Sequence, residues 1–107
     1  MIFHNAGCSP DSVLLSRVER QCLYYYARRD DACIFEHLDS PESLLARDDA
    51  GERYELYLIE LPSTAAAASL RAAAALRSRG RRSPLAFLAH TPAHAYSAYR
   101  VDAMQYL

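Results

Sequence analysis

The sequence predicts an α/β domain built on a parallel sheet, and three observations lead to this prediction. Short apolar runs of strand length alternate along the chain with segments of helical period or helical composition. Ser9-Pro10 and Ser40-Pro41 stand where helices should begin, because serine caps a helix and proline fits its first turn. Residues 56–59 are apolar without alternation, as in a strand that is covered on both faces.

In the first half of the chain, a strand is predicted over residues 1–6, followed by a loop at residues 7–8. A helix then begins at Ser9-Pro10-Asp11, where the aspartate suits the positive end of the helix dipole. Its buried face is expected to carry apolar residues spaced three and four apart, namely Val13, Leu14, Val18, Cys22 and Tyr25. A second strand is expected at residues 33–35 and a second helix from Ser40, with a polar turn at residues 48–52.

The second half of the chain repeats the alternation of strand and helix. The expected elements are a strand over residues 54–61, an alanine-rich helix over 64–79 that ends at Gly80, a strand over 85–88, a helix from Thr91 and an apolar segment over 101–107. Helical crossovers between parallel strands are right-handed and place helices on both faces of the sheet. We therefore expect one domain over residues 1–107, with strand order 2-1-3-4 and any residual fifth strand beside strand four.

The composition excludes several functional classes. Hydrophobic residues make up 51% and charged residues 23% of the chain, which is typical of a globular protein, and the net charge of -1 favours no polyanion. The arginines between residues 77 and 82 are interpreted as favourable charge at a helix end rather than a nucleic-acid site. We expect no membrane span, no signal peptide and no direct nucleic-acid binding. The three cysteines are expected to be reduced thiols in a cytoplasmic protein.

Three segments of the chain carry a resemblance to a known family. Residues 54–61, Y-E-L-Y-L-I-E-L, are similar to the family pattern Y-D-L-I-F-L-D-I, and residues 85–89, L-A-F-L-A, are similar to I-I-F-L-T. The closing residues 95–107 are similar to Y-A … A-F-x-V-x-A-x-D-Y-L. In this order the segments resemble the receiver domains of bacterial response regulators, above all those that precede a LytTR-type DNA-binding domain. The resemblance implies a flavodoxin-like, doubly wound fold that is truncated at its fifth strand and lacks the last helix.

The resemblance also implies a site at the carboxyl ends of the strands. In the family, an acidic pair after strand one holds Mg²⁺, an aspartate at the end of strand three accepts phosphate, and a hydroxyl residue follows strand four. We assign His4 and Asn5 to the acidic pair, Glu60 to the phosphoacceptor and Ala89 to the hydroxyl position. The family's lysine falls after the last residue of this chain. Tyr106 matches the aromatic residue that switches rotamer in active members.

These departures predict that the phosphorylation chemistry is lost. Mg²⁺ prefers oxygen ligands, which the imidazole of His4 does not offer. Glu60 displaces its carboxylate by one methylene, and in-line phosphoryl transfer depends on placement. Ala89 cannot donate a hydrogen bond. We therefore expect a regulatory pseudo-receiver with no catalytic residue, no metal and no cofactor, which controls an attached or partner output domain in transcription.

Two alternatives stay open at the level of sequence. The chain could still be phosphorylated by an atypical route in a phosphorelay, with Glu60 as acceptor, or Glu60 could imitate a permanent phosphate charge. The vacated pocket could instead hold a small molecule, or a transition metal between His4, Glu60 and His90.

A dimer interface is expected on the last helix and strand of the sequence. Tyr96 and Tyr99 lie three residues apart and share a helix face, with Val101 and Tyr106 following. Tyrosine supplies a large contact area with a polar tip, as interface residues often do. The resemblance implies the same surface, because the fourth helix and fifth strand transmit the signal in receivers. The alternative is that these tyrosines pack on the domain's own sheet.

Overall fold

A computed structural model describes residues 1–62, 66–89 and 105–106 of the chain. The elements are β1 (Ile2–Cys8), α1 (Ser12–Ala27), β2 (Ala32–Leu38), α2 (Pro41–Asp49), β3 (Leu56–Leu61), α3 (Ala66–Ser78), β4 (Leu85–Ala89) and β5 (Gln105–Tyr106). The strands form one parallel sheet in the order β2-β1-β3-β4-β5. The predicted fold class and strand order are therefore confirmed, whereas the helix expected from Thr91 lies outside the described residues.

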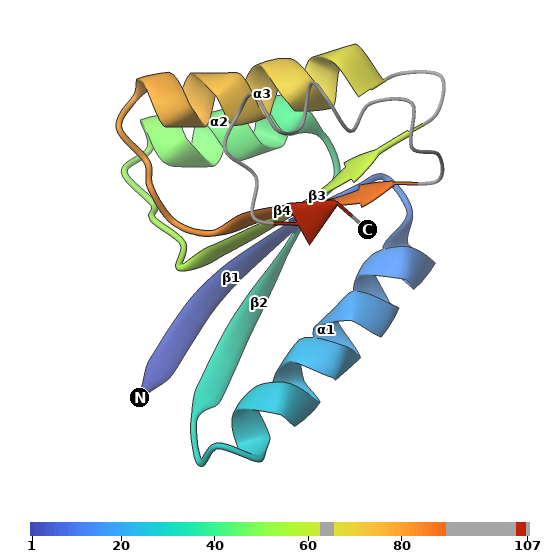
Figure 1. The fold of residues 1–107 in the computed structure, drawn as a ribbon, viewed down its shortest axis with the longest axis vertical. Coiled ribbons are helices and arrows are strands. Elements are labelled where there is room, and N and C mark those ends of the chain that lie inside the picture. The colour runs from blue at the N-terminus through green and yellow to red at the C-terminus, as the bar shows by residue number, and fades with distance from the viewer. Residues whose placement is uncertain (63–65, 90–104, 107) are drawn as a thin grey trace.

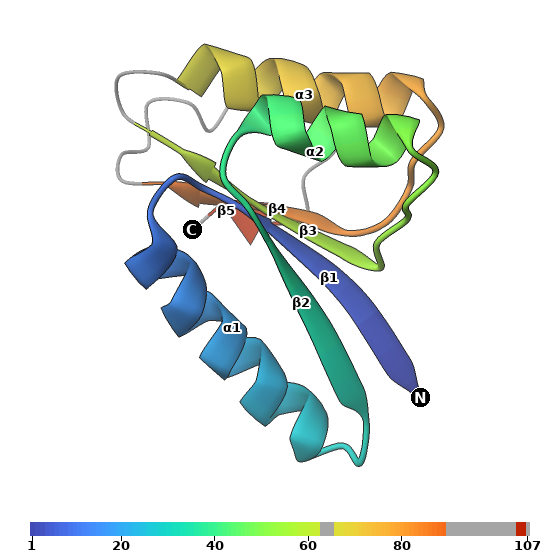
Figure 2. The same ribbon diagram turned by 180° about the vertical axis from the view of Figure 1, so that it is seen from behind.

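The described helices cover the sheet on its two faces (Figures 1 and 2). α1 lies on one face, and α2 and α3 lie side by side on the other. The larger core lies under α2 and α3, where Tyr57, Ile59 and Phe87 of the sheet meet Leu44 and Leu76 of the two helices. A smaller cluster of apolar side chains lies under α1. Within the described part of the chain, no helix has both the length and the apolar character needed to cross a membrane.

Local capping explains where the first two helices begin. The Asp11 side chain accepts hydrogen bonds from the backbone N–H groups of Val13 and Leu14, so Asp11 rather than Ser9 is the N-cap of α1. The Ser40 side chain caps α2 in the same way by accepting from the N–H of Ser43, and Pro41 occupies the first turn. Both helices therefore begin directly beyond the carboxyl end of a strand.

β1 is longer than the sequence predicted, and this changes the site. The strand continues through Gly7 to Cys8, and Gly7 pairs with residues of both β2 and β3. A Cβ atom at Gly7 would lie 2.6 Å from the Phe35 ring and 3.0 Å from a Leu15 methyl group. Glycine is thus present in the strand because α1 and Phe35 approach the backbone closely, and it does not mark the loop that we predicted.

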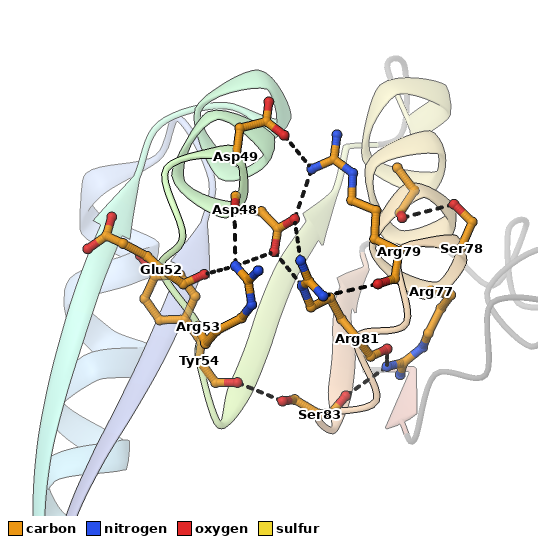
Figure 3. A network of polar contacts seen from close by, with 11 residues as sticks. Asp48, Asp49, Glu52, Arg53, Tyr54, Arg77, Ser78, Arg79, Arg81 and Ser83 are labelled. Carbon is orange, nitrogen blue, oxygen red and sulfur yellow. Dashed lines mark hydrogen bonds and ion pairs between the residues drawn. The ribbon is translucent and has the colours of Figure 1, made fainter.

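A buried carboxylate holds the opposite end of the α2–α3 layer together (Figure 3). Asp48, near the end of α2, has a side chain that is 3% exposed and pairs with Arg53, Arg79 and Arg81. The distances from its carboxylate oxygens are 3.3 Å to Arg53, 2.9 Å to Arg79 and 2.8 Å to Arg81. The arginines predicted to be solvated charges at a helix end are therefore partly structural. They join the end of α3 and the start of β3 to α2.

Candidate functional site

The carboxyl ends of β1 and β3 meet at a short, buried hydrogen bond. The Ser9 hydroxyl donates to Oε1 of Glu60 at 2.5 Å. The same hydroxyl accepts from the backbone N–H of Asp11 at 2.9 Å, and the backbone N–H of Ser9 donates to the carbonyl of Leu38 at 2.9 Å. Both residues are buried. Ser9 therefore links the ends of three strands to the start of α1, and it engages the Glu60 carboxylate within the protein.

His4 and Asn5 do not lie at this site, so their assignment to the acidic pair is wrong. Asn5 is paired with Leu56, the first residue of β3, whereas Cys8 is paired with Ile59, next to Glu60. The backbone N–H of His4 donates to a carboxylate oxygen of Glu55 at 2.8 Å, before β3 begins. The structure places Cys8 and Ser9 at the carboxyl end of β1.

Asn5 is fully buried beneath α1, where its side chain contacts residues of α1 and β2. Its amide nitrogen lies 3.3 Å from the Tyr26 hydroxyl and 3.5 Å from the Cys33 sulfur. The Tyr26 ring also stacks on Phe3, with ring centroids 4.8 Å apart. This part of β1 therefore anchors the end of α1, and it lies at the level of Leu56, four residues before Glu60. β1 does not bring His4 next to Glu60, so these two residues do not form the metal site that was considered for His4, Glu60 and His90. His90 lies outside the described residues.

Cys8 brings a thiol to the site but not a reactive one. Its side chain is buried, and burial raises the pKa of the thiol to about 12, with the carboxylates of Glu42, Asp39 and Glu60 acting in the same direction. The thiolate is the form that attacks electrophiles and binds metals. At neutral pH Cys8 therefore remains a protonated, apolar core residue.

A cavity of about 230 Å³ opens beside these groups. Its wall is formed by the residues that follow β1, β2 and β3 and by the first turns of α2 and α3. The lining residues are Cys8, Ser9, Pro10, Asp39, Ser40, Pro41, Glu60, Pro62, Ala68 and Ser69. Among the described residues, the lining combines two carboxylates with three hydroxyl groups and contains no cationic side chain, so this part of the wall does not favour an anionic ligand.

The remaining assigned positions are only partly described. Ala89 is the last residue of β4 and pairs with Leu61. It therefore lies at the carboxyl ends of the strands, as Glu60 does, and it supplies no hydroxyl group there. β5 places the backbone of Tyr106 beside Phe87. The side chain of Tyr106, and the interface candidates Tyr96, Tyr99 and Val101, lie outside what the structure describes. The predicted interface stays a prediction.

The donors at this end of the sheet do not fit Mg²⁺. A magnesium site needs several hard oxygen ligands in near-octahedral geometry. Here β1 supplies a protonated thiol and a hydroxyl, and the Glu60 carboxylate already accepts from that hydroxyl. Asp39 accepts a hydrogen bond from the Ser43 hydroxyl at 2.8 Å. In the described part of the chain, no three His, Cys, Asp or Glu side chains gather in a way that could hold a metal ion.

Comparison with solved structures identifies the architecture. The response regulator TrrA of Thermotoga maritima, solved in complex with Mg²⁺ and BeF, superposes with a TM-score of 0.77 at 10% identity, over 98% of this chain and 84% of that one. The chemotaxis protein CheY4 of Vibrio cholerae superposes with a TM-score of 0.76 at 12% identity, over 100% of this chain and 86% of that one. A response regulator receiver protein of Pseudomonas putida gives a TM-score of 0.69 at 12% identity, over 100% and 85%.

The chain has the receiver fold. No protein-family model and no curated protein matches the sequence, so the likeness is one of architecture. Within the receiver fold, Cys8 and Ser9 occupy the end of β1 and Glu60 the end of β3. Cys8 and Ser9 were not among the predicted site residues. The helix start at Pro10-Asp11 could have located them, because connections between a strand and the following helix are short.

Proposed function

We propose that this chain is a regulatory signalling module, a receiver-type domain that does not accept phosphate and acts through protein contacts. It has no enzymatic activity and works in the cytoplasm. Its output is an attached or partner domain, and the resemblance to receivers that precede LytTR domains suggests transcriptional control. One observation carries the proposal. The carboxylate at the acceptor position, Glu60, is buried and engaged by Ser9, which stands where receivers carry an acidic residue.

The chemistry of phosphoryl transfer supports this proposal. Catalysis of this reaction depends on positioning and on stabilising the charge of the transferred group, work that metal ions commonly perform. Cys8 and Ser9 supply no carboxylate for a metal ion, and Ala89 supplies no hydroxyl to the phosphoryl oxygens. Glu60 and Asp39 would repel a phosphate that entered the cavity without a metal ion. Two roles of the reaction, metal binding and stabilisation of the phosphoryl oxygens, are therefore missing at once.

Beryllofluoride provides a direct test of the vacated site. We expect that Mg²⁺ with beryllofluoride leaves the melting temperature of this chain unchanged, because a ligand stabilises a protein only if it binds the folded state. The receiver of Thermotoga maritima TrrA, solved with Mg²⁺ and BeF, serves as the positive control in the same buffer. A saturable rise in melting temperature for this chain, lost on Glu60→Gln, would show that the acceptor site still works.

A second candidate function is a small-molecule sensor, and the cavity beside Glu60 favours it. The cavity of about 230 Å³ has an apolar wall with carboxylates and hydroxyls at its rim, which suits a small neutral or cationic ligand. A melting-temperature screen with small amines and polyols would identify such a ligand. Its effect should disappear in Ser69→Leu, because leucine would fill the cavity from α3.

A further inference from the structure

β2 forms one edge of the sheet, and its outer backbone groups have no partner among the residues that the structure describes. The N–H of Ala32 donates to the carbonyl of Met1, and the carbonyl of Leu38 accepts from the N–H of Ser9. A parallel ladder uses alternate residues of a strand, so the even-numbered residues of β2 bond to β1. The N–H and C=O groups of Cys33, Phe35 and His37 therefore point away from β1, along the free edge.

The β2 edge lacks the features that usually prevent strand-to-strand association. Natural edge strands are protected by proline, lysine, bulges or charges that block a neighbour. β2 contains neither proline nor lysine, and its pairing with β1 is continuous from Ala32 to Leu38. Its acidic and its basic side chain, Glu36 and His37, are engaged within the chain.

Those two side chains point to opposite faces of the sheet, not across the edge. Glu36 accepts hydrogen bonds from Arg47 at 2.5 Å and from the Tyr54 hydroxyl at 3.0 Å, on the face of α2. His37 Nε2 lies 2.7 Å from Glu19 Oε1, on the face of α1. Neither side chain stands in the path of an incoming strand.

Apolar surface adjoins this edge on the face opposite α1. The amino-terminal halves of β1 and β2 extend beyond the layer formed by α2 and α3 (Figures 1 and 2). There Ile34 is 51% exposed and Ile2 is 58% exposed. Ile2 is in register with Ala32, one strand in from the edge and two residues before the level of Ile34. An added strand would cover Ile34.

We propose that the β2 edge pairs with β2 of a second copy of this chain. The two strands run antiparallel about a two-fold axis at Ile34, so that the sheet continues from one copy to the other. In this register Cys33 of one copy and Phe35 of the other exchange both backbone hydrogen bonds, and the two Ile34 residues form a close, non-hydrogen-bonded pair. This surface is independent of the proposed function and lies at the opposite edge of the sheet from β5.

A second copy fits this edge better than an unrelated strand because the strand is complementary to itself. About the axis at Ile34, residues 33 and 35 of both copies present their free backbone groups to each other. In this register no like charges face each other along the strand, because Glu36 of one copy stands opposite Ala32 of the other. Isoleucine opposite isoleucine is also a favourable cross-strand pair.

Analytical sedimentation of the native chain and two variants tests the proposal. We expect the native chain to sediment at twice the monomer mass of 12.0 kDa at high concentration. Ile34→Lys should weaken dimerisation at least tenfold, because it places two ammonium groups opposite each other. Val13→Lys is the matched control, since Val13 is also branched and is 64% exposed but lies on α1. A monomeric native chain, or a dimer that Ile34→Lys leaves intact, would overturn the proposal.

Disulfide crosslinking tests the register. In a background with Cys22→Ala and Cys33→Ala, the variant Ile34→Cys should form a covalent dimer on mild oxidation, because non-hydrogen-bonded pairs have Cα atoms about 4.5 Å apart. Ile2→Cys is the control, since it is equally exposed on the same face. β1 lies one strand further in, so two copies of residue 2 would be separated by three strand spacings, about 14 Å, across the sheet and by a further four residues along it. Equal crosslinking of both variants would contradict the pairing.

Discussion

Replacing Asp48 by asparagine should lower the free energy of unfolding by about 3 kcal/mol. The side chain is 3% exposed and is the common partner of Arg53, Arg79 and Arg81, so the amide would leave three guanidinium groups without their shared counter-ion. Partial exposure of the arginines keeps the expected loss near the lower end for a broken buried pair. Urea denaturation of both proteins measures the difference.

Asp49 provides the matched control for this substitution. It is the next residue, it also contacts Arg79 at 2.9 Å, and its side chain is 67% exposed. Exposed pairs contribute little, so Asp49→Asn should cost at most about 1 kcal/mol. An equal loss in both variants would show that burial of Asp48 does not matter.

The same network predicts a dependence of stability on acid. Burial alone would raise the pKa of Asp48, but hydrogen bonds from Arg81 and Arg79 outweigh burial, and the pKa in the folded state is lowered. The contribution of Asp48 is therefore fully present above its unfolded pKa of about 3.9. It is lost as the pH falls through the lower folded pKa. The difference between the native chain and Asp48→Asn should be constant near neutral pH and shrink in acid.

Replacing Gly7 by alanine should lower the free energy of unfolding by about 2 kcal/mol. The new methyl group would lie 2.6 Å from the Phe35 ring and 3.0 Å from Leu15, so β2 or α1 must shift to accept it. Thermal and urea denaturation measure the loss. Far-ultraviolet circular dichroism should show that the fold is retained.

A double-mutant cycle with Phe35 tests the cause of this loss. In a Phe35→Leu background the ring that meets the new methyl group is absent, so Gly7→Ala should cost less than half as much. An unchanged cost in both backgrounds would mean that backbone conformation, and not the close approach of Phe35, requires glycine at position 7.

Gly7 also explains why the sequence located the site on the wrong residues of β1. A glycine after a short apolar run predicts a turn, and this interpretation ended the strand at residue 6 and left His4 and Asn5 nearest its end. The glycine lies inside the strand because the Phe35 ring packs on its Cα, a contact between residues 28 positions apart. The sequence pattern of one strand does not show which side chains of other elements pack against that strand. The end of β3 at Leu61 was predicted correctly, because Pro62 marks it.

The helical period of α1 was predicted correctly, but its phase was not. Val18 and Cys22 pack on the sheet as expected, whereas Val13 and Tyr25 are exposed, and Leu15 and Tyr26 face inward instead. Apolar or aromatic residues occur in runs at 13–15 and 22–27 of this helix, so several phases bury a similar area. Tyr26 is selected by its partners Phe3 and Asn5 on β1, which the sequence of α1 does not contain.

The role of Asp48 could not be read from the sequence at all. Residues 48–52 are a polar run of the kind that usually forms a solvated turn, and Arg79 and Arg81 follow more than thirty residues later. Their contact exists because α2 and α3 lie side by side on one face of the sheet. Such pairs follow from the tertiary fold, which the alternation of strands and helices predicts only in outline.

We propose that the site at Ser9 and Glu60 does not accept phosphate. Intact-mass spectrometry after incubation with Mg²⁺ and acetyl phosphate measures whether it does, with a receiver that is known to be phosphorylated as the positive control in the same reaction. We predict that the mass of the native chain stays unchanged while the control gains one phosphoryl group. A stoichiometric phosphoryl adduct on the native chain that disappears in Glu60→Gln would contradict the account.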